Sequence, residues 1–415
     1  MRDEGLDPHP SPLIPHPPSR DALRRLALKV VATLLPSVRP LNRSPRRLLL
    51  IRPDHLGDVL LASPAIGALR EAAPEAHLTF LVGPWSEEVA SRGARVDEIL
   101  TCQFPGFARR PKRHILEPYQ VLLREARRLR DRYDLAVILR PDHWWGALLA
   151  AVAGIPLRLG WDTPTTRPFL TDALPLPPAT HAAHRNVILA GRAAGLVLGL
   201  PTLDPGGEPA GHRYQPIFRL TPEERAWAEF PQEANGPLVL LHPGSGSPLK
   251  NWPSGRWAEV ADALAERGAC VILTGGPDDL ASPQAVAAAM RTKPLILAGA
   301  TTLGQLGALA ERCALALGTD NGPLHLAAAL GAPTLRLYGP TDEALFGPWG
   351  PAVDHVVLTH QLPCRPCGNL LAPPCAAHKE PPCMLGIDTD RVITAAVKDL
   401  TARPPSRRRG GGRAG

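Results

Sequence analysis

The sequence contains no hydrophobic run long enough to cross a membrane. A bilayer-spanning helix needs about 20 consecutive, predominantly apolar residues, and the longest candidate here, residues 187–200, is interrupted by Arg192. Residues 1–18 also lack the apolar segment of a secretory signal. The sequence therefore predicts neither a spanning helix nor a secretory signal.

Cysteine is scarce, and one common nucleotide fingerprint is missing. The seven cysteines are an odd number in a long chain without a visible signal, so reduced thiols in the cytosol are expected. The loop after the first predicted strand contains no G-x-G-x-x-G, which disfavours a hydride-transfer enzyme that holds a dinucleotide there.

Proline and apolar residues are plentiful. The chain has 49 prolines, where average usage gives about 20, and this argues against coiled coils and long uninterrupted helices. The hydrophobic fraction is 44% and the charged fraction 20%, which excludes global disorder. At 415 residues, two or three domains are expected.

The net charge of +7 lies in the two ends of the chain. Residues 1–47 carry nine basic and four acidic residues, and residues 401–415 carry five arginines and no acid. Residues 48–400 carry 32 basic and 35 acidic residues, a net charge of −3. A basic face for nucleic acid is therefore not expected on the folded body, and the tail 401–415 is predicted to be a flexible basic end.

A basic amphipathic helix is predicted at residues 21–35, after a proline-rich leader. Arg24, Arg25 and Lys29 lie off its apolar face. The helix either packs on the protein's own surface or lies on an anionic membrane. Its apolar face consists of Leu23, Leu26, Ala27, Val30, Val31 and Leu34.

Strands and helices alternate twice along the chain. In the first half, strands are predicted at 47–52, 77–83, 96–100 and 135–140, with helices at 59–73 and 86–93. After the linker 231–236, strands are predicted at 237–244, 269–276, 294–299, 315–320 and 334–340, with helices at 255–267, 281–292, 303–312 and 323–330. Nearly continuous apolar strands between helices indicate parallel sheets covered on both faces. The prediction is an α/β protein with two tandem Rossmann-like domains that face a central cleft, where ligands bind beyond the carboxyl ends of strands.

Three loops at such carboxyl ends carry candidate chemistry. In the first, R-P-D-H-L-G-D (52–58), Asp58 is either a helix N-cap or a general base. In the second, L-H-P-G-S-G-S-P-L-K-N-W-P (241–253), Ser245, Gly246 and Lys250 offer hydroxyl, backbone and cationic ligands to an anion, unless the loop is simply solvated. In the third, G-T-D-N-G-P-L-H-L-A (318–327), a proline-started helix directs its N-terminus at the cleft; Asp320 or Asn321 could equally cap that helix, and His325 could pack under it.

Taken together, these loops resemble glycosyltransferase family 9, the ADP-heptose:lipopolysaccharide heptosyltransferases. The matching text is LLLIRPDHLGDVLLASPAIGALR, LVLLHPGSGSPLKNWP, ILTGGPDD, GTDNGPLHLAAALGAP and LYGPTDEALFGPWGP, in register over roughly residues 45–400. The resemblance implies a GT-B fold and an inverting transfer that needs no metal for chemistry. It divides the chain into a leader with the basic helix (1–44), an acceptor domain (45–220), a nucleotide-sugar donor domain (221–400) and the tail.

The resemblance also assigns roles to residues. Asp58 corresponds to the catalytic base, and Lys250 to a ligand of the donor phosphate. The implied partners are a nucleotide-diphosphate sugar, a glycolipid or other envelope glycan, and the inner face of the cytoplasmic membrane, to which the cytoplasmic enzyme would bind peripherally. Two alternatives to a glycosyltransferase remain: a non-catalytic sugar-nucleotide binder, and an enzyme that hydrolyses or isomerises a sugar nucleotide. The other implied donor ligands are Asn321, Gly322, Pro323 and Leu324, with Asp320 and His325 beside them and Asp278 or Asp279 near the ribose.

Two further groups are candidates. Asp142 and His143, after the strand at 135–140, could contact an acceptor or could pack at a buried edge. A C-x2-C-x7-C-x7-C segment could hold a structural zinc or an iron–sulfur cluster, or consist of plain thiols or disulfides. Its residues are Cys364, Cys367, Cys375 and Cys383.

Overall fold

The computed structural model describes most of the chain. The described residues are 18–35, 40–93, 95–108, 114, 116–200, 214–229, 236–349 and 355–401. Most of the predicted leader, of the linker 231–236 and of the tail 401–415 therefore lies outside them. Within the described part, no helix combines the length and apolarity needed to span a bilayer.

The first half is built on a six-stranded parallel sheet with the order β3-β2-β1-β4-β5-β6. Four of its strands match the predicted ones, and β5 and β6 were not predicted. The strands are β1 (Arg47–Arg52), β2 (His77–Val82), β3 (Glu98–Thr101), β4 (Leu135–Ile138), β5 (Leu157–Asp162) and β6 (Asp172–Pro175).

Helices cover both faces of this sheet, which explains why β1 is apolar at successive positions. Leu48 and Leu50 pack with α3 and α7, whereas Leu49 and Ile51 pack with α5 and α6. The helix predicted at 59–73 is two helices, because the chain turns at residues 61–62. The helices of this half are α1 (Pro18–Leu34), α2 (Leu56–Leu60), α3 (Ser63–Ala72), α4 (Glu87–Gly93), α5 (Glu117–Leu129), α6 (Trp144–Val152) and α7 (Ala182–Leu198).

The second half repeats the architecture with the strand order β12-β11-β10-β7-β8-β9, again all parallel. Its strands are β7 (Leu238–His242), β8 (Cys270–Leu273), β9 (Leu295–Ile296), β10 (Leu315–Thr319), β11 (Thr334–Tyr338) and β12 (His355–Thr359), the last not predicted. Its helices are α9 (Ser254–Ala265), α10 (Ala281–Ala289), α11 (Leu303–Arg312), α12 (Gly322–Ala329), α13 (Glu343–Phe346), α14 (Pro382–Leu385) and α15 (Thr389–Thr401).

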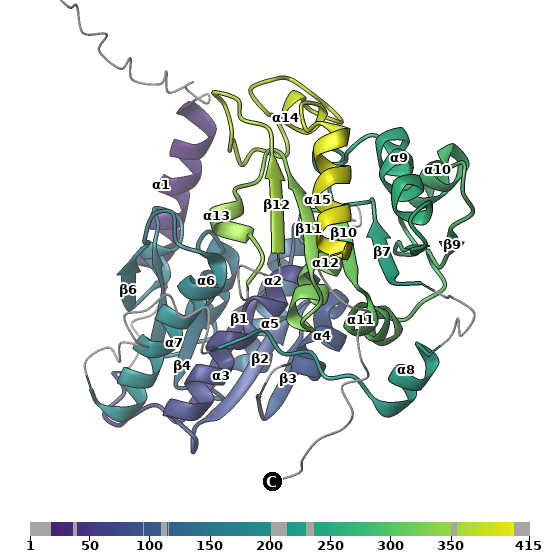
Figure 1. Ribbon diagram of the computed structural model, residues 1–415. Helices are drawn as coiled ribbons and strands as arrows, with labels where there is room; N and C mark the ends of the chain where they lie inside the picture. The colour runs from purple at the N-terminus through teal and green to yellow at the C-terminus, as the bar shows by residue number, and fades with distance from the viewer. Residues whose placement is uncertain are drawn as a thin grey trace, which may run out of the picture.

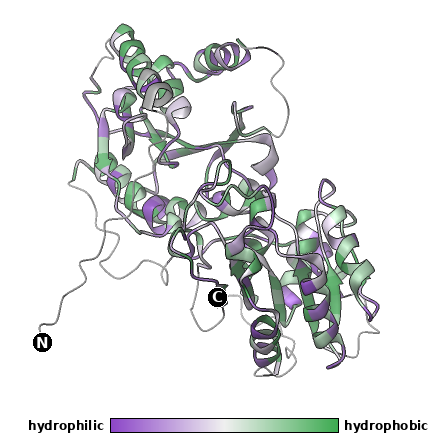
Figure 2. Ribbon diagram, turned by 90° about the horizontal axis from the view of Figure 1, so that it is seen from above, coloured by the Kyte–Doolittle hydropathy of each residue, from purple (hydrophilic) through white to green (hydrophobic). Residues whose placement is uncertain are grey.

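The two halves lie side by side and touch through α2 and α12 (Figure 1). Because β1 and β10 both end at this contact, the first and third predicted loops meet there. A connecting segment that contains Phe218 and Leu220 packs into a core cluster with residues from both halves, and α8 (Pro222–Trp227) follows it. Figure 2 shows the apolar strands in the interior of each half. The predicted pair of doubly wound sheets is confirmed.

Candidate functional site

Asp58 lies in the first turn of α2 but does not cap it. The N-cap is His55, which makes no side-chain cap hydrogen bond, and Asp58 is the third helical residue. Its Oδ1 instead accepts a hydrogen bond from Arg52 Nη2 at 2.9 Å. The N-cap alternative is therefore wrong, and about a third of the side chain remains exposed (34%).

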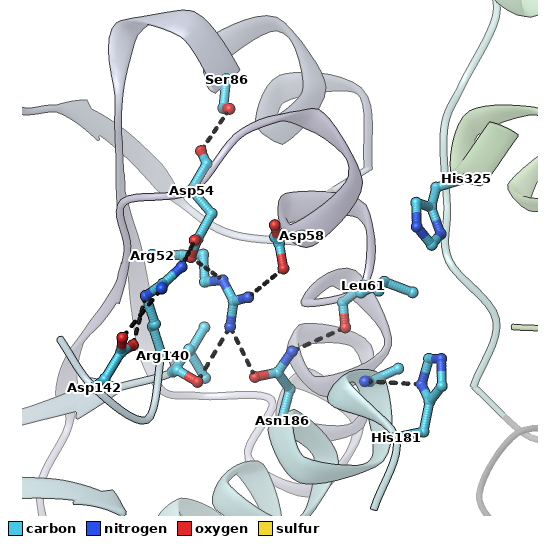
Figure 3. Close-up of polar contacts among 12 residues, drawn as sticks. Arg52, Asp54, Asp58, Leu61, Ser86, Arg140, Asp142, His181, Asn186 and His325 are labelled. Carbon is cyan, nitrogen blue, oxygen red and sulfur yellow. Dashed lines mark hydrogen bonds and ion pairs between the residues drawn. The ribbon is translucent and has the colours of Figure 1, made fainter. Parts of the chain in front are cut away.

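Arg52 connects Asp58 to a buried charge network. Its guanidinium is almost fully buried, forms an ion pair with Asp54 (Nε to Oδ2, 2.7 Å) and donates to the Leu139 carbonyl at 3.2 Å. Asp54 is also bound by Arg140, whose Nε pairs with Asp142 Oδ1 at 2.6 Å. Figure 3 shows Asp58 between this network and His325 of the other half.

The two carboxylates that share Arg52 have opposite pKa shifts. Burial and the nearby Asp54 charge raise the pKa of Asp58, and Arg52 and Arg140 only partly offset them. Burial acts in the same direction on Asp54, but the attraction of Arg52 and Arg140 outweighs it and lowers that pKa. Paired carboxylates separated in this way are typical of acid–base sites. Asp54 stays charged, and Asp58 is the group suited to take a proton.

The sequence contains a repeated motif that marks this network. The tetrapeptide Arg-Pro-Asp-His occurs at 52–55 and again at 140–143. Its two copies follow the neighbouring strands β1 and β4. Each arginine pairs with the aspartate of its own copy, and Arg140 also bonds Asp54 of the first copy. The repeat therefore builds a crossed ion-pair network at the carboxyl edge of the sheet.

The second copy also corrects one predicted acceptor contact. Asp142 is exposed at 67% of its side chain and remains a candidate. His143 is buried, packs against Phe104 and Phe107, and its pKa falls to about 3 because of burial. A ring enclosed in this way does not reach an acceptor in this conformation, so the buried-packing alternative holds for His143.

On the other half, Lys250 and Asp320 form a charged pair. Lys250 Nζ donates to the Asp320 carbonyl at 2.6 Å and lies 3.2 Å from its Oδ2. Burial would raise the pKa of Asp320, but Lys250 and His325 hold it far below its usual range. An ammonium has three N–H donors, so one remains for a further ligand of Lys250.

His325 and a buried arginine form a chain of contacts that leads to Asp320 of this pair. Arg336 Nη1, which can only donate, lies 3.3 Å from His325 Nδ1, so Nδ1 is the acceptor and the proton sits on Nε2. His325 Nε2 lies 3.6 Å from Asp320 Oδ1. Burial lowers the pKa of His325, and Asp320 only partly offsets this. Arg336, in the middle of the apolar strand β11, was not predicted as a site residue.

The N-terminus of α12 offers fewer donors than the sequence suggested. Asn321 caps the helix by accepting from the Leu324 N–H at 3.0 Å, and Pro323 has no N–H. Of the first three helical residues, Gly322 keeps an N–H that no side chain caps, together with the positive end of the helix dipole. Asn321 Nδ2 also donates to the Gly244 carbonyl at 2.9 Å, which joins the second and third loops.

The remaining predicted donor residues are placed around Gly244. Ser245 Oγ lies within hydrogen-bond distance of the Ser247 carbonyl and Asn251 Oδ1, at 2.7 and 2.8 Å, so its hydroxyl holds the loop together. Gly246 is exposed in the same loop. Of the two aspartates considered for the ribose, Asp279 lies over the loop, because a Cβ at Gly244 would be 1.5 Å from its Oδ2, whereas Asp278 is exposed.

The two sides of the site are in direct contact through glycines. A Cβ at Gly57 would lie 2.9 Å from His325 Cδ2, and a Cβ at Gly322 would lie 2.9 Å from Leu56 Cδ2. Asp320 is close enough to contribute to the raised pKa of Asp58. The absence of side chains at these positions lets the carboxylate of one half approach Asp320 and the helix terminus of the other.

The four cysteines of the C-terminal segment line one pocket. Cys383 is buried, and burial together with the neighbouring thiols raises its pKa to about 11. Nevertheless, among the described residues no three His, Cys, Asp or Glu side chains are arranged to hold a metal ion. The thiols line the same pocket without forming a metal-ligand set in this conformation.

Comparison with solved structures defines the class of protein. The fold matches glycosyl transferase family 9 from Veillonella parvula, with a TM-score of 0.66 at 26% identity over 88% of this chain and 99% of that one. It also matches Escherichia coli ADP-heptose lps heptosyltransferase II, with a TM-score of 0.65 at 24% identity over 86% and 99%. The two facing sheets are those of a GT-B glycosyltransferase.

Sequence comparison gives the family. The family model described as glycosyltransferase family 9 (heptosyltransferase) matches residues 122–372, more than half of the chain. Lipopolysaccharide heptosyltransferase 3 of Escherichia coli K12 is 28% identical over 312 residues, which cover 71% of this chain and 82% of that protein. This chain belongs to glycosyltransferase family 9. The family-model match begins after the loop of Asp58, so the role of that residue rests on its geometry.

Proposed function

We propose that the protein transfers a heptose from a nucleotide-diphosphate sugar, of the ADP-heptose kind, to a lipopolysaccharide-core or related envelope glycan. The observation that carries this proposal is the meeting of Asp58 with the Lys250–Asp320 pair across the contact between the halves. The names of its relatives, among them lipopolysaccharide heptosyltransferases 1, 2 and 3, support the choice of sugar and acceptor.

In the proposed reaction, Asp58 is the general base. Arg52 holds Oδ1, which leaves Oδ2 to accept the proton of the acceptor hydroxyl. As that proton leaves, the hydroxyl oxygen forms a bond to the anomeric carbon, and the bond from this carbon to the diphosphate breaks. Because base and leaving group are held by opposite halves, attack from the face opposite the diphosphate, and hence inversion, is expected.

Lys250 and the start of α12 stabilise the leaving diphosphate in this proposal. The third N–H of Lys250 and the N–H of Gly322 would donate to phosphate oxygens, with the helix dipole adding a partial positive charge. Asp320 orients the ammonium through its carbonyl and carboxylate. No metal ion is required for these steps.

The test is a transfer assay with the full chain, ADP-heptose and a heptose-containing core acceptor, with ADP release and product mass as readouts. Lys250→Ala should weaken ADP binding by one to two decades, since a charge-assisted contact is worth about 1.5–3 kcal/mol. Lys293→Ala, which removes an exposed lysine of the same half, is the matched control and should bind ADP as the wild type does.

Two outcomes would contradict the proposal. Release of free heptose without acceptor product, at the same rate with and without acceptor, would identify a sugar-nucleotide hydrolase. Tight binding of ADP-heptose without any turnover on heptose-containing acceptors would identify a binding protein. Unchanged ADP affinity of the Lys250→Ala variant would remove Lys250 from the donor site.

A further inference from the structure

Helix α1 is attached to the first half by a face that the sequence pattern did not single out. Leu28 is 7% exposed and belongs to the core cluster of α5 and α6, with Ala32 and Leu35 packed against it. The guanidinium of Arg24 lies over the Trp144 ring, 5.0 Å from its centroid. The helix is therefore fixed to the domain and does not need its predicted apolar face for packing.

That predicted apolar face is directed at solvent. Leu26 is 60% exposed, Val30 51%, Val31 38% and Leu34 78%. At 100° per residue Leu26, Val30 and Leu34 lie on the side of the helix opposite Leu28, and Val31 lies at the border between the two faces. One helix thus has two apolar faces, one buried in its own domain and one that nothing among the described residues covers.

The charges beside the exposed face have one sign. Arg25 and Lys29 are exposed and one helical turn apart, so they form a basic edge along one border of the exposed apolar face. Residues 22–35 contain no aspartate or glutamate. An apolar stripe with a basic border complements a surface that combines hydrocarbon with anionic groups.

The helix also lies near the side of the domain on which the acceptor is expected. α1 contacts the short turn Arg167–Phe169 and Trp144, the first residue of α6. Trp144 follows directly on the second Arg-Pro-Asp-His copy at the carboxyl end of β4. In Figure 1, α1 stands beside α6 and β6 at the margin of this half.

We propose that the exposed face of α1 is a docking surface for an anionic lipid bilayer, on which the helix lies parallel to the surface with Leu26, Val30 and Leu34 inserted. A second copy of the chain fits this face less well. Two copies would bring like-charged basic edges together, and one helical stripe covers little of the about 800 Å² per partner that stable protein interfaces bury. The idea that this docking brings the site close to a lipid-anchored acceptor rests on the proposed function. Membrane binding itself does not rest on it.

Flotation with vesicles of phosphatidylcholine and phosphatidylglycerol tests the surface without any substrate. The full chain should float with these vesicles. The triple variant Leu26→Gln/Val30→Gln/Leu34→Gln should partition at least about tenfold less, because three apolar side chains no longer insert. Leu371→Gln is the matched control, since Leu371 is a 98% exposed leucine of the other half, and it should float as the wild type does.

Charge is tested separately with Arg25→Gln/Lys29→Gln. This variant should lose about tenfold or more of its binding to anionic vesicles, and the wild type should bind pure phosphatidylcholine weakly. Equal flotation of the wild type and the triple variant, or no flotation of either, would overturn the docking surface. So would a concentration-dependent dimer that the triple variant abolishes.

A second measurement, of sugar transfer, tests the proposed function independently of membrane binding. With a detergent-solubilised acceptor, the triple variant should transfer sugar at the wild-type rate, because the substituted side chains point away from the domain. Loss of transfer on this acceptor, with an unchanged melting temperature, would show that the face acts in the reaction and not in membrane docking. Absence of transfer by the wild type would contradict the proposed function and leave the flotation result intact.

Discussion

At the scale of single residues, Arg52 gives two aspartates different properties. Asp54 is 3% exposed and is bound by both Arg52 and Arg140. Among the residues that the structure describes, only Arg52 binds Asp58, which lies beside the negative charge of Asp54. Since each guanidinium favours the charged form of a carboxyl, the difference in partners accounts for the opposite pKa shifts. A proton that arrives at this site is therefore expected on Asp58.

The variant Asp58→Asn separates catalysis from stability. It keeps the shape of the side chain and removes the base, so transfer should fall by at least about 10². Because the folded-state pKa of Asp58 is raised, ionisation of this residue opposes folding above its unfolded pKa. The melting temperature at neutral pH should therefore stay unchanged or rise. In the wild type, kcat/KM should decline as the pH falls through the raised pKa.

Steady-state transfer and thermal unfolding of the same preparation measure both quantities. A variant that transfers sugar at nearly the wild-type rate would show that another group is the base. A clear drop in melting temperature would show that the Arg52–Asp58 pair contributes more to folding than the raised pKa implies.

At the scale of elements, the contact of α2 with α12 depends on residues without side chains. Gly57→Ala places a methyl group 2.9 Å from Cδ2 of His325, whose ring is held by Asp320 and Arg336. We expect the halves to separate slightly and transfer to fall by about tenfold or more, as small displacements at a reacting site do. The measurement is kcat/KM for both substrates.

Gly67→Ala is the matched control for this change. Gly67 lies inside α3 of the same half, and an added Cβ would meet nothing within 4 Å. Alanine is the better helix former by about 1 kcal/mol, so this variant should be slightly more stable and fully active. Full activity of Gly57→Ala as well would mean that the contact tolerates a side chain.

The cysteine segment is expected to act on stability and not on turnover. Cys383 is buried, whereas Cys364 is exposed, so Cys383→Ser should lower the melting temperature more than Cys364→Ser, by burying a hydroxyl. Both variants should keep kcat/KM within about twofold. Zinc analysis of chelator-free protein completes the test: one zinc per chain, lost in both variants with equal destabilisation, would identify a shared metal site.

At the scale of the whole molecule, α8 forms ion pairs with both halves. Glu224 accepts from Arg92 of the first half at 2.7 and 2.9 Å, and Arg225 pairs with Glu311 of the second half at 2.8 Å. The Arg225–Glu311 pair is largely exposed, and such pairs are individually weak, roughly 0–1 kcal/mol. The Arg92–Glu224 pair has two hydrogen bonds and is mostly buried (19% and 14% exposed), so these contacts hold α8 more firmly to the first half than to the second.

Stability of the whole chain should decrease with acidification in two stages. Burial lowers the pKa of His143 to about 3, lowers that of His242 to about 4, and also lowers that of His325. Since these histidines bind protons in the unfolded chain but not in the folded one, stability is lost as pH falls below about 6.5. Asp54 and Asp320, with lowered pKa values, add a second loss below about 4. Melting temperatures from pH 8 to pH 3.5 measure this, and a rise between pH 7 and pH 5 would contradict it.

The sequence predicted the interior of the fold better than its margins. β1 and α11 begin and end at the predicted residues, because a strand buried on both faces is continuously apolar and a capping box marks the start of that helix. β5 and β6 escaped prediction since they lie toward the edge of the sheet and contain charged residues such as Arg158 and Asp172. β12 is an edge strand as well.

The candidate site was predicted in part for a similar reason. Asp58 and Lys250 could be predicted because they lie in loops that directly follow apolar strands. Arg52, which binds Asp58, and Arg336, which donates to His325, belong to apolar strands, where a single charge looks like an exception to the pattern. Only the strand order β1-β4 places Arg140 beside Asp54, and spacing along the chain does not contain that order.

The repeated Arg-Pro-Asp-His tetrapeptide has a genetic consequence. Among the described residues, Asp54→Asn leaves Arg140 paired with Asp142 and Arg52 paired with Asp58, and an ion pair is damaged most when only one partner is removed. Adding Arg140→Gln removes one of these two positive charges, so the double variant should be destabilised by less than the sum of the two single variants. Selection for regained stability in an Asp54→Asn background should then recover second-site suppressors at position 140, and additive losses in denaturant unfolding would argue against this. Two stretches 88 positions apart in the sequence would in that case be under joint selection.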